Sequence, residues 1–381
     1  MSQIPAATFR RPARALPFWL SLWTVPVGLT AALVAGWAVL LMPVYTWGLY
    51  ALLDAVLGPN LEDADPDTPE ADLVWYRLIT LIWFPVQFGM LAFLLYYVPR
   101  ADLSALEKIG IFFGQGVMSG SIGIVYAHEL MHQKNRLERG LGDLLLASVL
   151  YSHFRTEHLL VHHLYVGTPR DAVTARYGQS FYRVFVDVLA RCPKSAWRAE
   201  VAMLRRRGKG AFDRRNPFWR YAGLQAAMIV LANVLGGWVG LGLFLYQAFI
   251  AIWQLELVNY VEHYGLTRAH LGDGRYEPVQ PRHSWNAAQK ASNWLLINLQ
   301  RHSDHHWKPD RRFPLLQNYA ATEAPQLPYG YPMMTAAAMV PPLWRRMMNP
   351  RVKAWRKQFY PQITDWQSYS KGLTPLPKGA P

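Results

Sequence analysis

The chain has 381 residues and a formal net charge of +14, and it is 52% hydrophobic but only 17% charged. Its apolar residues occur in long blocks, and its 16 tryptophans and 20 tyrosines are an aromatic load typical of membrane–water interfaces. These features argue against two soluble domains and predict an all-α integral membrane protein. The single cysteine, Cys192, excludes an internal disulfide and a Cys-rich zinc or iron–sulfur site.

The excess of positive charge has two possible meanings. A basic balance is common in proteins that bind nucleic acid. Here Lys and Arg concentrate between and after the apolar blocks, as the positive-inside rule expects of cytoplasmic loops. We therefore predict a lipid membrane as the partner of this charge, and no nucleic acid.

The first third of the chain predicts four membrane spans. Residues 1–17 are basic and are predicted as a cytoplasmic N-terminus that leads into a retained signal anchor. Within residues 18–127, apolar runs near 18–36, 38–57, 74–98 and 108–127 each approach the roughly 20 residues that one spanning helix needs. An acidic, Pro-rich loop at 58–73 and a break at 99–107 separate them.

The rest of the chain alternates between predicted cytoplasmic regions and spans. Residues 128–218 form one such region, in which 141–153 is apolar but too short to span. Residues 219–262 predict two more spans, near 219–237 and 239–261, divided by Gly236 and Gly237. Residues 263–381 form a second cytoplasmic region, in which 336–344 is expected to dock on the protein or the membrane interface. About six spans then place both termini and every histidine cluster in the cytoplasm.

Nine of the 12 histidines carry the chemical signal, in three clusters and one isolated position. Residues three or four apart share a helix face, so we expect three clamps: His128 with His132, His158 with His162, and His302 with His305. Imidazole suits iron, zinc, copper and nickel, and zinc takes about four ligands. Nine imidazoles therefore predict two metal ions, with these candidate ligands: His128, His132, His158, His162, His163, His263, His302, His305 and His306.

Each cluster has a carboxylate beside it. A metal-bound histidine usually donates its second ring N–H to a carboxylate or carbonyl, which fixes the tautomer. We expect this role, or that of an occasional ligand, for Glu129, Glu157, Glu262 and Asp304. His153, His270 and His283 are expected to be structural or surface residues.

Two other classes of protein fit parts of this pattern. His128-Glu129-Leu130-Met131-His132 matches the His-Glu-x-x-His motif of zinc proteases, which makes a membrane zinc metalloprotease a remote alternative. Such an enzyme does not need the other clusters. A membrane metal or haem transporter would carry histidines or charges midway along its spans, whereas these clusters lie at one membrane boundary.

The three clusters resemble the histidine boxes of the integral-membrane non-haem di-iron family, which includes fatty-acid desaturases and membrane hydroxylases. The segments Asn-Tyr-Val-Glu-His-Tyr-Gly-Leu at 259–266 and Leu-Gln-Arg-His-Ser-Asp-His-His at 299–306 are similar to the narrower signatures of bacterial alkane 1-monooxygenases. The chain departs from the best-known members at Met131, where they have Gly, and at 159–161, where Leu-Leu-Val replaces Asn-Arg-Gly.

The resemblance implies terminal hydroxylation of medium-to-long-chain n-alkanes to 1-alkanols with O2. Two non-haem iron ions on the nine histidines would receive two electrons from rubredoxin, which rubredoxin reductase reduces. It also implies a bacterial inner (plasma) membrane, an active site facing the cytoplasm and an alkane taken from the bilayer. A related hydroxylase of aromatic methyl groups, as in xylene or cymene, and an acyl desaturase stay open.

The chemistry agrees with this implication. An unactivated C–H bond offers no handle to acid–base or nucleophilic catalysis, so the metal must be redox-active, which zinc is not. Because rubredoxins are acidic, basic residues within 164–218 and 301–312 are expected to dock the electron donor.

Overall fold

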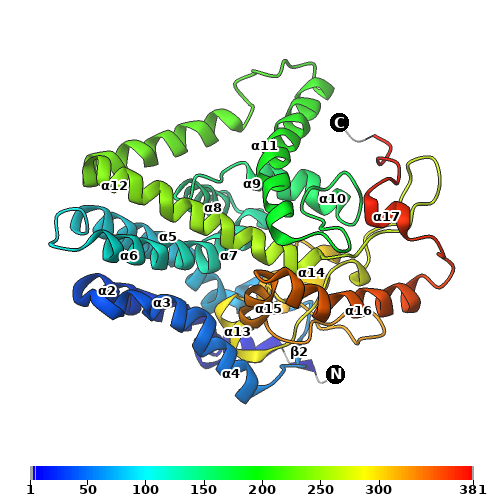
Figure 1. The fold of residues 1–381 in the computed structure, drawn as a ribbon, viewed down its shortest axis with the longest axis horizontal. Helices are drawn as coiled ribbons and strands as arrows, with labels where there is room; N and C mark the ends of the chain where they lie inside the picture. The colour runs from blue at the N-terminus through cyan, green and yellow to red at the C-terminus, as the bar shows by residue number, and fades with distance from the viewer. Residues whose placement is uncertain (1–2, 5, 380–381) are drawn as a thin grey trace.

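Helices dominate the computed structural model, which describes residues 3–4 and 6–379 (Figure 1). The longest are α2 (Thr24–Val34), α5 (Val74–Tyr97), α6 (Ala105–Met118), α8 (Arg136–Ala147), α11 (Phe181–Arg206), α12 (Phe218–His263) and α16 (Pro341–Phe359). Shorter helices include α3 (Leu41–Pro43), α4 (Tyr50–Leu57), α7 (Ile124–His132), α9 (Phe154–Glu157), α10 (His163–Tyr165), α13 (Lys290–Leu295), α14 (His302–Trp307), α15 (Tyr331–Ala338) and α17 (Gln367–Lys371). Two short strands, β1 (Gln3–Ile4) and β2 (Asp63–Ala64), pair in parallel.

Five helical stretches among the described residues are long and apolar enough to cross a membrane: Pro12–Val34, Gly36–Leu57, Glu70–Tyr97, Ala105–His132 and Phe218–His263. The last has 46 residues and is broken at Gly237, whose φ of 61° lies in a region that glycine enters readily. The predicted class, an all-α integral membrane protein, is confirmed. The number of six crossings stays a prediction, for which the two arms of α12 would supply the last two.

Three turns lie at the end of the bundle that is far from α14 and α16 (Figure 1): one at Gly36, one between α5 and α6, and one at Gly237 in α12. The backbone N–H of Gly36 donates to Glu107 Oε1 (2.9 Å), and Glu107 also closes the capping box with Ser104 at the start of α6. Arg100, in the turn between α5 and α6, donates to the carbonyl of Leu235 beside the break in α12 (2.6 Å). The helices thus form hairpins whose open ends all point to the same side.

At the opposite end, the predicted acidic loop 58–73 forms ion pairs with residues on both sides of the histidine cluster 302–306. Asp63 pairs with Arg301 (3.2 Å), and Glu70 pairs with Arg312 (2.8 Å). These two arginines lie on either side of residues 302–306. The acidic composition of the loop therefore has a structural cause, because its carboxylates bind cations that flank the histidines.

The segments 141–153 and 336–344, which were expected not to span the membrane, both pack on the helix bundle. Helix α8 covers most of 141–153 and lies against α7, where a Cβ at Gly142 would come within 3.2 Å of the carbonyl oxygen of Ala127. Trp344 is buried, with its ring 5.2 Å from that of Tyr260 and 5.3 Å from that of Tyr264. The segment 336–344 docks on the protein, as predicted.

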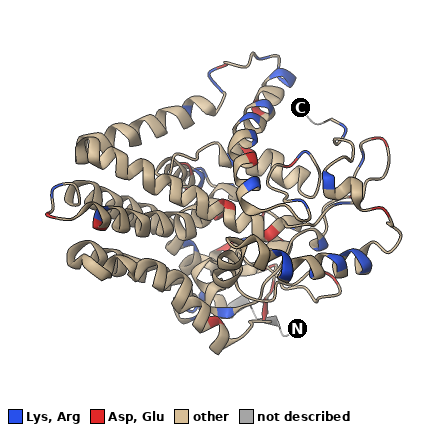
Figure 2. Cartoon of the chain, in the orientation of Figure 1, with Lys and Arg blue, Asp and Glu red and all other residues tan. Residues whose placement is uncertain are grey.

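Charge is distributed unevenly over this fold. Figure 2 shows long helices that are almost free of charged residues over much of their length, while Lys and Arg gather on α11, on α16 and on the loops around α14. The arrangement fits an apolar belt around the hairpins and a basic region at their open end.

Candidate metal centre

The nine clustered histidines come together in two adjacent groups at the open end of the hairpins. The five-histidine group contains His128, His132, His158, His163 and His305, and the four-histidine group contains His162, His263, His302 and His306. Within each group, one ligand atom from every residue lies within 4.8 Å of all the others. The ring centres of His163 and His306 are 4.6 Å apart, so the groups adjoin.

The ring nitrogens in each group converge on a common centre. In the five-histidine group, Nε2 of His158 lies 2.9 Å from Nε2 of both His128 and His163. A neutral imidazole nitrogen is either donor or acceptor, so a nitrogen between two others satisfies at most one of them by hydrogen bonding. Nε2 of His132 is buried and has no hydrogen-bond partner. A cation at the centre would use all of these lone pairs.

The spacing of the nitrogens also fits a metal ion. Neighbouring Nε2 atoms in the four-histidine group are 3.0 to 3.2 Å apart, between His302 and His306, His263 and His302, and His162 and His306. Imidazole nitrogens bind a first-row ion such as zinc at roughly 2.0–2.1 Å, so two of them at right angles would lie about 3.0 Å apart. Each group can therefore hold one ion through neutral nitrogen donors.

Two of the three expected clamps are wrong: His158 and His162 lie in different groups, and so do His302 and His305. The backbone explains the first of these separations. His158–His162 is a π-helical turn, in which hydrogen bonds connect residues five apart. His158 therefore shares the five-histidine group with His163, and His162 faces the other group. Residues His128 and His132 lie on the α-helix α7 and stay together, as expected.

The third cluster divides in a similar way. On α14, His302 and His306 are four apart and share the four-histidine group, whereas His305 joins the five-histidine group. Helix α14 thus lies between the two centres and contributes to both. The sequence predicted the membership of the whole set, but not its division.

The four predicted carboxylates have different surroundings. Glu262 lies closest to a predicted ligand atom, with Oε2 3.3 Å from Nε2 of His302, and its Oε1 accepts a hydrogen bond from the hydroxyl of Tyr331 (2.8 Å). Oε2 thus approaches the ring nitrogen of His302 that faces the centre of the four-histidine group.

Glu129 and Asp304 bind groups other than the histidines, and Oε1 of Glu157 is buried without a hydrogen-bond partner among the described residues. Glu129 accepts from the side chain of Gln133 (3.0 Å). Asp304 accepts from Arg311 and from the hydroxyl of Tyr319 (2.6 Å), which holds α14 against the loop that follows it. Burial, with Asp171 and Glu256 nearby, raises the pKa of Glu157 well above its ordinary value.

Sequence reasoning missed Asp171, which supports a histidine of the centre. One of its oxygens lies 3.0 Å from Nδ1 of His162 and accepts from the hydroxyl of Thr174 (2.7 Å). Burial by itself raises the pKa of Asp171, but the His162 ring and the bond from Thr174 outweigh it and lower the pKa below its ordinary value. The carboxylate therefore stays ionised and holds the Nδ1 proton, which leaves Nε2 free to bind a metal. In the sequence, the only hint of this contact is that Asp171 follows His162 by nine residues.

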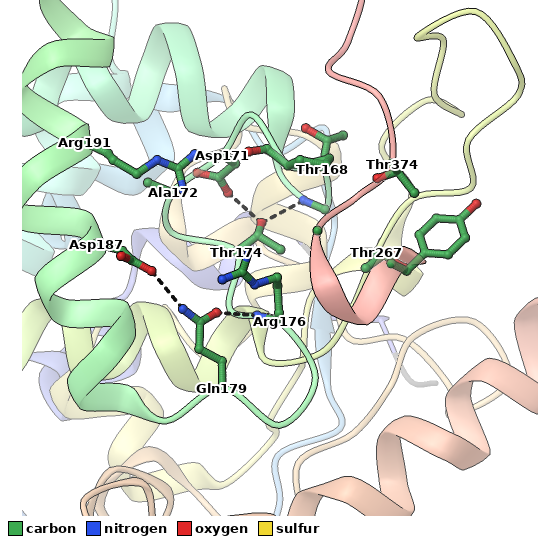
Figure 3. A pocket seen from close by; sticks show the side chains of 14 residues that line it. Thr168, Asp171, Ala172, Thr174, Arg176, Gln179, Asp187, Arg191, Thr267 and Thr374 are labelled. Atoms are coloured by element: carbon green, nitrogen blue, oxygen red, sulfur yellow. Dashed lines mark hydrogen bonds between the residues drawn. The ribbon is translucent and has the colours of Figure 1, made fainter. Parts of the chain in front are cut away.

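Asp171 also lines a polar cavity of about 80 Å³ (Figure 3). Asp171 and Thr174 line it together with Arg176 and Arg191, and Asp187 accepts from the side chain of Gln179 at its edge (3.0 Å). None of the nine clustered histidines lines this cavity.

An apolar pocket lies beside the centre, between the spans. Val125 lies one helical turn before His128 on α7, and Leu299 lies three residues before His302 in the turn that precedes α14. Val258 and Tyr331 also line the pocket, and Tyr331 binds Glu262. Gly120 and Ser121 line the pocket as well. The pocket thus joins a mostly apolar space to the four-histidine group.

Similarity to known proteins agrees with this geometry. A family model described as fatty acid desaturase matches residues 105–338. Alkane 1-monooxygenase 2 of Pseudomonas aeruginosa is 41% identical over 84% of this chain and 86% of its own length, and alkane 1-monooxygenase 1 of the same organism is 39% identical over 88% of each. The xylene/toluene monooxygenase hydroxylase component XylM of Pseudomonas putida is 28% identical over 82% of this chain and 83% of its own length. The chain therefore belongs to the alkane 1-monooxygenase family of integral-membrane, histidine-rich proteins.

Proposed function

We propose that this protein hydroxylates the terminal carbon of medium-to-long-chain n-alkanes. One O2, two electrons and two protons would convert the alkane to a 1-alkanol and water. The electrons would come from reduced rubredoxin, with rubredoxin reductase upstream. The proposal places the protein in a bacterial inner membrane, with the histidine groups facing the cytoplasm.

The observation that carries this proposal is a mostly apolar pocket with wall residues three positions before His128 and His302, and with Tyr331, which binds Glu262, in the same wall. Val125, Val258 and Leu299 present hydrocarbon side chains to this pocket, and none of the residues that line it is charged. A substrate without polar atoms gains from such a wall, because each buried methylene contributes about 0.8 kcal/mol. Since the pocket lies between spans, an alkane dissolved in lipid can approach it from the bilayer.

We assign the nine histidines as ligands of two iron ions, one in each group. Bound iron would supply the redox chemistry that O2 reduction and attack on an unactivated C–H bond require. The chain's own residues orient the site: Asp171 holds the ring of His162, while Tyr331 holds Glu262 beside His302. Within the basic segments 164–218 and 301–312, Lys308 and the exposed arginines of 205–215 would face an acidic rubredoxin. Arg301, Arg311 and Arg312 are already paired with carboxylates of this chain.

Metal content is the first test. The full chain, purified in detergent, is analysed by plasma emission spectrometry. About two irons per chain with little zinc would support the assignment. One zinc and no iron would contradict it and would favour the protease alternative instead.

Activity is tested in proteoliposomes with rubredoxin, rubredoxin reductase and NADH, using a panel of n-alkanes. Gas chromatography should detect 1-alkanols, and ¹⁸O2 should label their hydroxyl oxygen. His263→Gln should abolish product, while the control His270→Gln should not, because His270 packs on Tyr276 outside both groups.

The similarity to XylM supports one further candidate, an aromatic methyl hydroxylase. Xylene and cymene therefore join the same panel. Benzylic alcohols without any 1-alkanol would replace the alkane assignment, and an alkene product from an acyl chain would favour a desaturase.

A further inference from the structure

Helix α11 (Phe181–Arg206) has three distinct faces. At about 100° per residue, its buried side chains fall on one face, which packs on the protein. The fully or largely buried residues on this face include Phe181, Val184, Phe185, Val188, Cys192 and Ala196. The two remaining faces point away from this core, and they differ in character.

One of these faces is an exposed apolar stripe. Tyr182, Val186 and Leu189 are 51%, 64% and 39% exposed, and their spacing of four and three residues puts them on one side of the helix. A soluble surface seldom presents such a row without a partner. The hydroxyl of Tyr182 donates to the carbonyl of Met339 (2.8 Å), which fixes the direction of this end of the stripe.

The neighbouring face is basic. Arg183, Arg191, Lys194 and Arg198 are all exposed, and Asp187 is the one acidic side chain among them. Within the described part of the chain, Arg183, Lys194 and Arg198 form no ion pair. Three cations are therefore available to an external anion along about 16 residues, or roughly 24 Å, of helix.

The position of α11 relates the stripe to the membrane. The ring of Phe185 lies 5.9 Å from that of Phe249, a 49% exposed residue in the second arm of the span α12. The buried face of α11 therefore packs against this span, and the neighbouring apolar stripe lies beside the exposed surface around Phe249. Figure 1 shows α11 running across the direction of α5 and α6, close to where α12 begins.

We propose that α11 is an in-plane amphipathic helix that binds the surface of an anionic phospholipid bilayer. Tyr182, Val186 and Leu189 enter the acyl-chain boundary, while Arg183, Lys194 and Arg198 meet lipid phosphates. A helix with an apolar face beside a Lys/Arg-rich face binds membranes in this way, and anionic lipid attracts the cations. The inference does not depend on the reaction proposed above.

This contact would also steady the second histidine cluster. Ala199 packs with Val161 and Tyr165, which flank His162 and His163. The hydroxyl of Thr156, two residues before His158, donates to Glu200 on α11 (2.8 Å). Lipid on the outer faces of α11 would hold its inner face against the segment that carries these ligands.

The chain suits site-directed spin labelling, because Cys192 is its only cysteine and is 2% exposed. In a Cys192→Ala background, single cysteines replace Val186, Leu189, Arg183 and Arg198. Each is labelled with a nitroxide and reconstituted in vesicles of phosphatidylglycerol and phosphatidylcholine. Val234→Cys, on a 69% exposed position of α12, is the lipid reference, and Arg214→Cys in the α11–α12 connection is the aqueous reference.

Power saturation with O2 and a water-soluble nickel complex measures where each label lies. We expect labels at 186 and 189 to collide mainly with O2, like the label at 234, and labels at 183 and 198 to collide mainly with nickel. Labels at 186 and 189 that match the aqueous reference would overturn the proposal. Dipolar broadening at 186 would also overturn it, because a second copy of the chain would then cover the stripe.

The choice of lipid tests the charge. Vesicles of phosphatidylcholine alone should leave the labels at 186 and 189 less deeply placed than vesicles with phosphatidylglycerol. Equal depth in both would contradict the assignment to anionic lipid. Unchanged iron content and size-exclusion profiles identify the variants that keep their fold.

Discussion

Replacing Asp171 with asparagine tests how the four-histidine group is held. The substitution keeps the shape of the side chain but removes the negative charge that faces Nδ1 of His162 at 3.0 Å. The histidine then loses the group that stabilises its Nδ1 proton and raises the basicity of Nε2. The five-histidine group has no contact with Asp171 through a bond of this kind, so only one of the two ions should be affected.

The expected magnitude follows from comparable supporting residues. Losing such a partner typically weakens metal binding by about 10–100-fold, or about 1.4–2.7 kcal/mol. Iron release into a chelator, followed in the purified full chain, should therefore show one ion leaving at a 10–100-fold lower chelator concentration. The second ion should leave as in the unmodified protein, and it reports that the fold is intact.

Asp187→Asn is the matched control, because Asp187 lines the same polar cavity but accepts from Gln179. The control should release both ions as the unmodified chain does. If Asp171→Asn did the same, the assigned role of Asp171 would be wrong. Weakening of both ions to the same extent would point instead to damage of the whole centre.

Three further predictions concern packing, substrate length and pH. Gly120→Ala should lower the free energy of unfolding by about 1–3 kcal/mol, because the new Cβ would lie 2.7 Å from the carbonyl oxygen of Ala251. The control Gly140→Ala in α8 has open space around the new Cβ and should raise the free energy of unfolding by about 0.5–1 kcal/mol. Equal effects of the two substitutions on thermal unfolding would refute the close approach of Gly120 to Ala251. Val258→Trp should narrow the apolar pocket and shift the product profile in gas chromatography toward shorter alkanols. Each methylene that no longer fits would lose about 0.8 kcal/mol of binding free energy. An unchanged profile would mean that the substrate binds outside this pocket. Burial by itself raises the pKa of Glu277, but hydrogen bonds, first that from His283, lower this pKa from 4.5 to about 2. The ionised carboxylate therefore stabilises the fold above pH 4.5, and this stabilisation is lost as the pH falls toward 2. Glu277→Gln should lower the melting temperature at pH 7 and should reduce the change in melting temperature between pH 4.5 and 2. An unchanged pH dependence would contradict the stabilising role of this carboxylate.

Local sequence properties were sufficient to predict the membrane class and to select the nine histidines that the structure brings together. Apolar run length is a property of consecutive residues, and all five stretches that can cross a membrane fall on the predicted blocks. Gly237 was also visible, as part of the pair that divides the last block, and the structure breaks α12 at that residue. The nine histidines could be selected because no packed core needs so many imidazoles in three short clusters.

The division of those histidines could not be predicted from spacing. The assumption of α-helical geometry put His158 with His162, and the π-helical turn at 158–162 moved His162 to the other group. A single extra residue in a helical turn rotates every later side chain, and the sequence does not mark where that turn occurs. The same limit applies to His305, which α14 directs away from His302.

By itself, the sequence determined which residues are apolar, which can bind metal and where helices can cross a bilayer, because those properties depend on residue type and near neighbours. Only the tertiary structure decided which nitrogens share a centre, that Asp171 supports His162 and that Glu262 lies beside His302. His162 and His306 are 144 positions apart, yet their Nε2 atoms lie 3.2 Å from each other. Such contacts depend on how whole hairpins pack, and no local pattern carries that information.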